Sequence, residues 1–260
     1  MKILVTGHMG FIGSNMVKRL KSLEHTVGTY EPGDKLPDVS KYDWVMHLGA
    51  NSYTTERNVE LIMKQNLDSS IWFYEQCKEN DVNFQYASSA SIYGLNKEFK
   101  EDSPVDPRTP YAWSKYLFER YVKQNPGNII YQGFRYFNVY GTGEERKGNQ
   151  ASPFAQFARQ AKDKKEIKIF VGSAKYQRDF IHVEDVIDYH LRFLKVKECG
   201  VWNIGNGITR SFLDVANIVN RDYNVPIVEI PMPEILKSSY QEYTCADMTK
   251  TRTTLSKHEC

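Results

Sequence analysis

The residues Lys2-Ile3-Leu4-Val5-Thr6, followed directly by Gly7-His8-Met9-Gly10-Phe11-Ile12-Gly13, decide the fold of this chain. The first five are mostly apolar, as in the buried strands of a parallel sheet. The three glycines that follow permit a tight turn, a close approach of backbone to a pyrophosphate, and contact between helix and sheet. Apolar residues then recur at helical spacing from Phe11 to Leu23, so the N–H groups at the helix start would point at phosphates. The stretch predicts dinucleotide binding; the alternative is a βα turn that is merely tight.

Signals for strands and helices continue to alternate along the first half of the chain. Further strands are expected at His25–Tyr30, Trp44–Leu48, Asn83–Ala87 and Ile129–Phe137, and helices at Asn58–Lys78 and Tyr111–Val122. This alternation predicts an α/β fold with a doubly wound parallel sheet of the Rossmann type. Residues 31–42 are too few for a helix, a third strand and another connection, since one crossover usually takes ~10–12 residues. We therefore expect the usual edge strand beside the second strand to be missing.

After Asn138 the pattern becomes looser and predicts a small α/β substrate lobe. Beyond a polar loop at Gly141–Gln150, the expected elements are Ser152–Lys162, Ile167–Val171, Val183–Leu194, Trp202–Ile204, Phe212–Val219 and Pro226–Ile230. We expect residues 1–137 with 176–196 to form the dinucleotide-binding domain. Residues 138–175 with 197–260 would form the substrate-binding lobe.

The bulk composition argues against several classes of protein. The chain has 34 basic and 32 acidic residues, for a formal net charge of +2, and no basic block interleaved with aromatic residues. Nucleic acid is therefore not an expected partner. The sequence has no run of 18 apolar residues, so no membrane span is predicted. An apolar strand starting at Lys2 leaves no room for a secretory signal, and we therefore expect a cytoplasmic protein. Cys77, Cys199, Cys245 and Cys260 lie far apart, which favours reduced thiols, and no metal site is expected.

Two polar segments suggest acid–base chemistry. In Tyr111-Ala112-Trp113-Ser114-Lys115 the tyrosine and the lysine lie one helical turn apart. A phenol has a pKa near ~10, and a neighbouring ammonium would lower that pKa and make the phenol a usable acid/base. Ser89 follows a strand at the carboxyl side of the sheet, where ligands bind in this architecture, and its hydroxyl would hold a substrate oxygen. The alternatives are a surface pair of side chains and a polar turn.

The glycine turn, Ser89, Tyr111 and Lys115, in this order, resemble the extended short-chain dehydrogenase/reductase family, and the resemblance covers nearly the whole chain. That family joins a Gly-x-x-Gly-x-x-Gly turn to a Ser/Thr, Tyr and Lys triad. The resemblance implies catalytic roles for Ser89, Tyr111 and Lys115. Dehydratases and decarboxylases of the family carry a glutamate after the Ser/Thr. The residues here are Ala90-Ser91, which argues against both activities.

Longer stretches are similar to the ADP-L-glycero-D-manno-heptose 6-epimerase family. They are residues 47–56, 133–141, Lys147-Gly148, Ala151-Ser152, Arg178-Asp179-Phe180, Tyr240-Gln241 and Ala246-Asp247. The resemblance implies a second acid/base at Lys147; from its sequence alone, this segment would be a solvated charged loop. Arg178 suits a diphosphate, which a guanidinium binds in a bidentate way, and the alternative is a surface pair with Asp179.

The resemblance also implies the ligand contacts. Cofactor contacts would fall on Gly7, Gly10, Phe11, Ile12, Gly13, Glu31, Lys35, Leu48, Gly49, Ala50, Asn51, Ser52, Asn66, Tyr111 and Lys115. Substrate contacts would fall on Asn138, Val139, Lys147, Asn149, Gln156, Phe170, Val171, Gly172, Ser173, Arg178 and Tyr240. Asn149 and Gln156 replace a Ser and a His of that family, which leaves the sugar open. That family also continues with one more helix after 249–252.

These signals together predict a nucleotide-sugar epimerase that acts by transient oxidation with bound NAD(P), with ADP-glycero-manno-heptose as its expected substrate. Tyr111 and Lys147 would act as acid/base from opposite faces of the sugar, with Ser89 holding the oxygen. Lys115 would set the pKa of Tyr111 and hold the nicotinamide ribose. Glu31 suits the ribose 2′-OH of NAD, whereas the family preference favours NADP with Lys35 near its 2′-phosphate, and we expect NADP. The alternatives are another NDP-sugar epimerase or reductase, or a non-catalytic NAD(P)-binding sensor. A homo-oligomer is expected.

Overall fold

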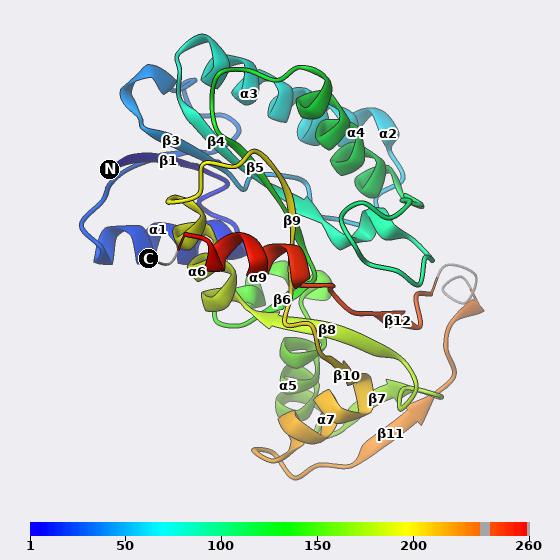
Figure 1. Ribbon diagram of the computed structural model, residues 1–260. Coiled ribbons are helices and arrows are strands. Elements are labelled where there is room, and N and C mark those ends of the chain that lie inside the picture. The colour runs from blue at the N-terminus through cyan, green and yellow to red at the C-terminus, as the bar shows by residue number, and fades with distance from the viewer. Residues whose placement is uncertain (235–239, 259–260) are drawn as a thin grey trace.

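A parallel sheet forms the centre of the computed structural model, which describes residues 1–234 and 240–258, with the backbone only at Arg146 (Figure 1). The strand order is β2-β1-β3-β4-β5-β9, and every neighbouring pair is parallel. The bounds are β1 Lys2–Thr6, β2 Thr26–Tyr30, β3 Trp44–His47, β4 Asn83–Ser89, β5 Tyr131–Tyr136 and β9 Gly200–Ile204. The predicted doubly wound α/β fold is confirmed.

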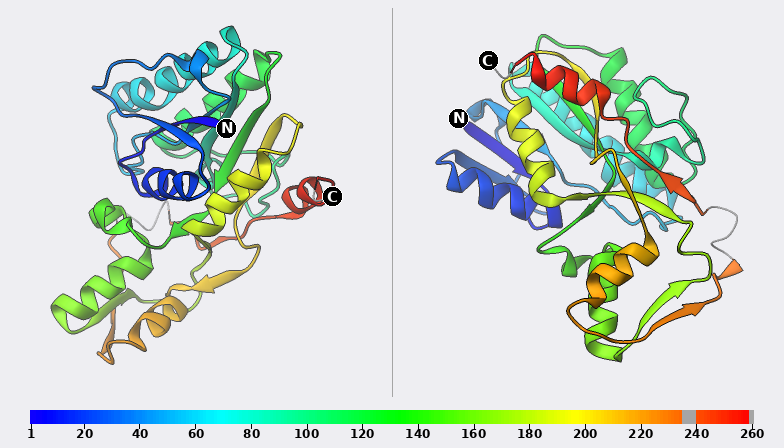
Figure 2. Two further views of the ribbon diagram at one scale, coloured as in Figure 1. Left: turned by 90° about the vertical axis from the view of Figure 1, so that its left-hand side faces the viewer. Right: turned by 60° about the horizontal axis from the view of Figure 1, so that its bottom comes forward.

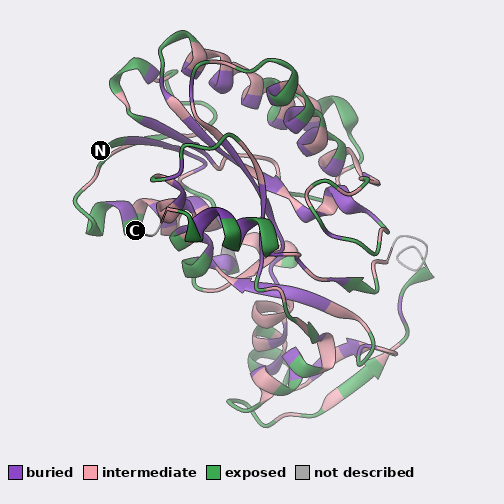
Figure 3. Ribbon diagram, viewed as in Figure 1, coloured by how far each residue is buried: buried purple, intermediate pink, exposed green. Residues whose placement is uncertain are grey.

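Helices cover both faces of this sheet, which explains why its inner strands are mostly buried (Figure 3). On one face, α1 (Phe11–Ser22) and α6 (Val183–Phe193) bury residues such as Met16 and Ile187 against β1 and β3. On the other face, α3 (Ser69–Glu79) and α4 (Pro110–Gln124) bury residues such as Phe73 and Phe118 against β3 and β4. The helix predicted at Asn58–Lys78 is α2 (Val59–Ile62), a π-helical turn η2 (Met63–Asp68) and α3.

Strand β2 is the edge of the sheet, as predicted. Within residues 31–42 of the described chain the regular structure is a short 3₁₀ turn, η1 (Val39–Lys41), whose start is capped by the Asp38 carboxylate. The connection therefore runs from β2 past β1 to β3 without adding a strand. β2 is only partly buried, because no strand covers its outer side.

The second half of the chain builds a smaller α/β unit (Figure 2). Its strands are β6 Asn138–Tyr140, β7 Ile167–Phe170, β8 Gln177–His182, β10 Thr209–Ser211, β11 Ile227–Ile230 and β12 Tyr243–Thr244. β8 pairs with β6, β10 and β12, and β7 pairs with β11. The helices α5 (Pro153–Lys164) and α7 (Phe212–Asn220) pack together around Phe157, Ile169 and Val215.

The division into two units stays a prediction, but three segments lie on the other side of the expected boundary. Gly200–Ile204 pairs with β5 in the large sheet, and the last helix, α9 (Thr249–Ser256), packs against it through Leu255. Gln177–His182 instead pairs within the smaller unit. Residues 144–150 form 3₁₀ turns, η4 (Glu144–Gln150), where a loop was expected. Within the described ranges, no helix has the length and apolar character that crossing a membrane requires.

Candidate active site

The glycine turn joins β1 to α1 with very little free space. Gly7 adopts φ +71° and donates its N–H to the carbonyl of Tyr30 at 3.0 Å. A Cβ on Gly13 would lie 2.0 Å from the Gly7 carbonyl oxygen, and a Cβ on Gly7 would lie 2.5 Å from the Cα of Gly49. Among the described side chains none caps the start of α1 after Gly10, so its first N–H groups suit a phosphate.

Glu31 follows β2 and contacts the same turn. Its Oε1 accepts the N–H of Met9 at 2.7 Å and lies 3.7 Å from Nδ1 of His8. Its own N–H donates to the Asp34 carboxylate at 2.8 Å, which closes the segment into a turn. Lys35 is exposed. A carboxylate therefore stands beside the glycine turn at the end of β2, where this architecture binds a ribose hydroxyl.

A buried polar chain fixes the segment after β3. The Thr6 hydroxyl accepts the N–H of Gly49 at 3.2 Å and lies 2.8 Å from Nδ1 of His47. Nε2 of His47 lies 3.0 Å from the Ser70 hydroxyl oxygen. Burial, helped by the Lys115 charge, lowers the pKa of His47 to about 3. The ring is therefore neutral at physiological pH and bridges the glycine turn to α3.

Asn66, in the π-helical turn η2, links the segment after β3 to α4. Its side chain accepts the N–H of Asn51 at 2.7 Å and donates to the Asn51 carbonyl at 3.0 Å. It also donates to the Ser114 hydroxyl at 3.2 Å, which in turn donates to the Tyr111 carbonyl at 2.7 Å. The structure thus brings together Gly49, Asn51 and Asn66; the predicted Leu48, Ala50 and Ser52 lie in the same segment.

The three triad residues predicted from sequence come together where α4 meets the end of β4. The Tyr111 phenol is hydrogen-bonded to the Ser89 side chain. The Lys115 ammonium is only 5% exposed, donates to the Ala87 carbonyl at 2.9 Å and lies 5.9 Å from the centre of the Tyr111 ring. The Ser89 hydroxyl also accepts the N–H of Ser91 at 3.2 Å, which fixes its direction.

One electrostatic expectation for these residues needs correction. Burial raises the pKa of Tyr111, and the hydrogen bond with Ser89 opposes that rise. The Lys115 ammonium, which was expected to lower the pKa of this phenol, donates to the Ala87 carbonyl. Burial also lowers the pKa of Lys115 to about 8, against the opposing charge of Glu119.

Lys147 lies in η4, which folds back onto the start of α1. The buried Glu144 carboxylate holds this segment by accepting the N–H of Gly141 and both the N–H and the hydroxyl of Ser152, at 3.1, 2.7 and 2.8 Å. The Lys147 ammonium lies 5.7 Å from the centre of the Phe11 ring. Burial lowers the pKa of Lys147, against Glu144. A solvated loop is therefore wrong for this lysine.

Arg178 is a buried cation without an anionic partner among the described residues. Its guanidinium carbon lies 5.4 Å from the ring centres of both Phe212 and Tyr240, and it donates to the Gln177 carbonyl at 2.9 Å. Asp179 is not its surface partner. That carboxylate is fully buried and accepts three backbone N–H groups, those of Asn206, Gly207 and Ala246. Burial lowers the pKa of Arg178, opposed by Tyr240.

The other predicted substrate residues fall into three groups. Phe170, Val171, Gly172 and Ser173 form the end of β7 and the next turn, and the Phe170 ring lies 6.5 Å from that of Tyr240. Asn138 starts β6, followed by Val139, and donates to the Asp179 carbonyl at 3.1 Å. The Gln156 amide donates to the carbonyls of Asn149 and Ala151 at 3.3 and 2.7 Å, so α5 contacts η4.

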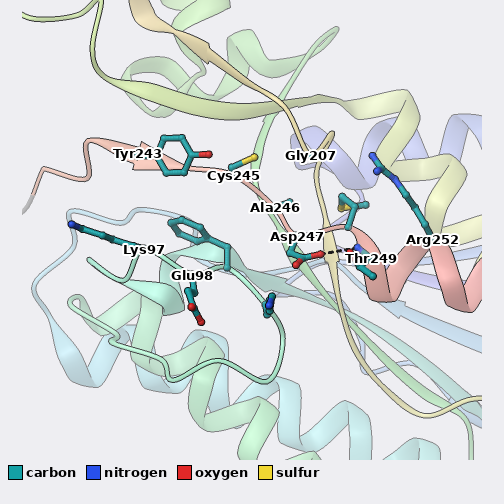
Figure 4. Close-up of a pocket in the computed structure, with 12 residues that line it drawn as sticks. Lys97, Glu98, Gly207, Tyr243, Cys245, Ala246, Asp247, Thr249 and Arg252 are labelled. Carbon is teal, nitrogen blue, oxygen red and sulfur yellow. Dashed lines mark hydrogen bonds between the residues drawn. The ribbon is translucent and has the colours of Figure 1, made fainter.

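Two cavities lie away from these residues. One, of about 430 Å³, opens between residues 97–100 and the segment from Tyr243 to Arg252 (Figure 4). The other, of about 1090 Å³, runs between α4, β9 and α9 and includes Glu119 and Arg135. Neither is lined by a residue predicted from sequence, so neither marks the site assembled above. Within residues 1–234 and 240–258, no cluster of three or more His, Cys, Asp or Glu side chains is placed to hold a metal ion.

A buried charged pair behind the triad escaped sequence reasoning. The Glu119 carboxylate accepts the Ser88 hydroxyl at 2.5 Å and two donors of the Arg135 guanidinium at 3.0 and 2.6 Å. Its signal in the sequence was the spacing of Tyr111, Lys115 and Glu119, each one helical turn apart.

Comparison with known proteins places this geometry in context. The sequence model of the NAD dependent epimerase/dehydratase family matches residues 3–205. The fold is similar to ADP-L-glycero-D-manno-heptose-6-epimerase of Helicobacter pylori, with a TM-score of 0.87 and 26% identity over 98% of this chain and 90% of that chain. For UDP-glucose 4-epimerase of Thermus thermophilus in complex with NAD, the TM-score is 0.82 and the sequence identity is 25%, over 97% of this chain and 92% of that chain. UDP-N-acetylglucosamine 4-epimerase of Methanobrevibacter ruminantium is similar in fold, with a TM-score of 0.88 and 22% sequence identity over 98% of this chain and 91% of that chain.

Proposed function

The chain belongs to the NAD dependent epimerase/dehydratase family, and within it we propose that this protein is a nucleotide-sugar epimerase that works by transient oxidation. The observation on which the proposal rests is the meeting of Ser89, Tyr111 and Lys115 at one end of the sheet, tied to the segment after β3 through Asn66. ADP-glycero-manno-heptose, epimerised at C6, is the substrate we propose. The similarity to the Helicobacter pylori enzyme and the placement of Lys147 support it.

The residues of the turn fit a nicotinamide dinucleotide. Gly7 and Gly13 leave no room for side chains, so the backbone itself faces the phosphates. When bound, the cofactor would supply the hydride acceptor, and then the hydride donor, for the transient oxidation of the sugar carbon. We propose NAD rather than the NADP expected from sequence. The Glu31 carboxylate beside the turn suits a ribose hydroxyl and would repel a 2′-phosphate, while Lys35 is exposed.

The protein's own groups would move the proton that accompanies the hydride. Tyr111 would take it from the reacting hydroxyl and give it back, with Ser89 holding the same oxygen. Lys115, fixed by the Ala87 carbonyl, would hold the nicotinamide ribose. Lys147 would serve the opposite face of the sugar, since burial brings the pKa of its ammonium down towards the range that an acid/base needs.

Arg178 would bind the diphosphate of the substrate. A buried guanidinium left without a carboxylate is costly for the folded protein, and an anionic ligand offsets that cost. The flanking rings of Phe212 and Tyr240 leave the guanidinium free to bind phosphate oxygens in a bidentate way. This arrangement favours a nucleotide diphosphate sugar over a free sugar.

A two-part experiment tests the proposal. Mass spectrometry of the nucleotide released from denatured protein identifies the cofactor, and NAD is the expected result. The protein is then incubated with ADP-heptose, UDP-glucose and UDP-N-acetylglucosamine, and epimerisation is followed by NMR. Turnover of ADP-heptose alone is expected. Turnover of a UDP-sugar instead would show that this sugar, and not ADP-heptose, is the substrate. Tight NAD binding without any turnover would favour a non-catalytic sensor. The expected homo-oligomer is checked by light scattering.

A further inference from the structure

Helix α4 and the end of β4 meet through three successive contacts. They pair Tyr111 with Ser89, Lys115 with the Ala87 carbonyl, and Glu119 with the Ser88 hydroxyl. The three helix residues lie four apart, so they form one stripe along α4. The three strand residues are consecutive. A shift of the helix along the strand would break all three contacts at once.

Of the three contacts, the one made by Glu119 is the most tightly fixed. Its carboxylate is 7% exposed and is bound at both oxygens by Arg135, which is 5% exposed. Arg135 stands opposite Ser88 in the register of β4 and β5, and it also donates to the Tyr93 hydroxyl at 2.9 Å. A bidentate pair of this kind fixes direction as well as distance. Glu119 therefore connects α4 to two strands of the sheet.

We propose that Glu119 is a positioning residue for the reaction, which sets the register of α4 against β4 and so holds Tyr111 and Lys115 at the reacting hydroxyl. The inference rests on the proposed function, because it presumes that these two side chains do the chemistry. Glu119 itself contacts neither of their reacting atoms. It acts through the Ser88 contact and through the helix.

The charge of Glu119 also affects the pKa of Lys115, and this effect can be measured separately from turnover. Burial lowers the pKa of Lys115 to about 8, and Glu119 opposes that shift. Removing the carboxylate charge would therefore lower the pKa of Lys115 further. A residue that served only as packing would not move this titration.

Two variants separate the geometric effect from the charge effect. Glu119→Gln removes the charge, whereas Ser88→Ala removes the contact with β4 and leaves the Glu119–Arg135 pair intact. Both are expected to reduce kcat by about tenfold to a hundredfold with KM within about twofold, since misplacement by ~1 Å can cost that much. The alkaline limb of the pH–rate profile should move to lower pH in Glu119→Gln only.

Glu75→Gln is the matched control. Glu75 lies on α3, pairs with Lys78 at 2.9 Å and accepts the Tyr121 hydroxyl of α4 at 2.9 Å, but it does not contact β4. It should leave kcat and the pH profile unchanged. NMR titration of the Lys115 side chain in lysine-labelled holoenzyme reports the same pKa shift without turnover.

Unchanged kcat and an unchanged Lys115 titration in both variants, with only a lower melting temperature, would overturn the positioning role. That result differs from a failure of the proposed function, in which Tyr111→Phe itself would keep normal turnover. If Glu119→Gln does not fold because Arg135 is left unpaired, Ser88→Ala decides: normal kcat in that variant overturns the proposal, and reduced kcat supports it.

Discussion

Tyr111 and Lys115 show that burial, more than the neighbouring charge, sets the acidity of single side chains in this site. The phenol has a raised pKa and the ammonium a lowered one, the direction that desolvation gives each group. Ser89 nevertheless fixes the phenol and the Ala87 carbonyl fixes the ammonium. In this site, geometry rather than a lowered phenol pKa supports the proposed role.

Tyr111→Phe isolates the phenol from the fold. The ring and its packing are kept, so folding and NAD binding should persist, while turnover should fall by ~10²–10⁴, the usual scale for a lost acid/base. Turnover is measured on the substrate that wild-type protein accepts, with thermal melting as the check on folding. Near-normal turnover would remove Tyr111 from the mechanism.

Lys147→Met tests the second acid/base. The aliphatic stem beside Phe11 is retained, so nucleotide binding should persist, whereas epimerisation should be abolished because one face of the sugar loses its proton carrier. Lys164→Met, at an exposed position on α5, is the control and should behave as wild type. Epimerisation at an ordinary rate in Lys147→Met would favour a one-base mechanism.

At the scale of elements, the sequence predicted those with strong local periodicity, but it did not predict which distant segments pair with one another. The glycine turn, α1 and α4 follow from spacing alone. β8 was not predicted because its sequence, Gln177 to His182, contains a buried arginine that packs against distant rings and a buried aspartate that accepts distant N–H groups. The contacts of Ser88, Glu119 and Arg135 were also not predicted. The register of β4 and β5 brings these residues together, and no local sequence pattern encodes that register.

The junction of β1 and α1 gives a prediction at this scale. Gly13→Ala would place a Cβ 2.0 Å from the Gly7 carbonyl oxygen, so the backbone of the turn must move. NAD affinity should fall on the order of tenfold or more, or about 1.4 kcal/mol, while the sheet still folds. Calorimetric titration with NAD measures this.

Gly127→Ala is the control for Gly13→Ala. Its added Cβ meets the flexible side chain of Lys78 rather than backbone, so a small rotation of that side chain makes room. Unchanged NAD affinity in Gly13→Ala would show that the turn does not hold the pyrophosphate.

For the whole molecule, two buried histidines make stability depend on pH. Burial lowers the pKa values of His47 and His190 to about 3, from 6.5. Between these values the unfolded chain binds protons that the folded protein excludes, so stability is lost as pH falls from 6.5 towards 3. The free energy of unfolding should drop by about 2 kcal/mol per histidine between pH 7.5 and 5.

Urea denaturation at pH 7.5, 6 and 5 measures this loss of stability. His190→Gln should remove about half of the pH dependence, whatever its effect on absolute stability. A free energy of unfolding that stays constant over this range would mean that the two rings are accessible to protons in the folded protein.

The interleaving of the two units has a consequence for how such a protein can acquire a new specificity. β6 follows β5 after Phe137 alone, α6 begins directly after β8, and residues 205–208 join β9 to β10. Replacement of residues 138–246, the continuous segment that spans the smaller unit, by that of a relative would also replace α6 and β9, and with them part of the large sheet and its cover. Exchange of one continuous segment therefore cannot replace the smaller unit alone. Point substitutions within that unit would leave the large sheet unchanged.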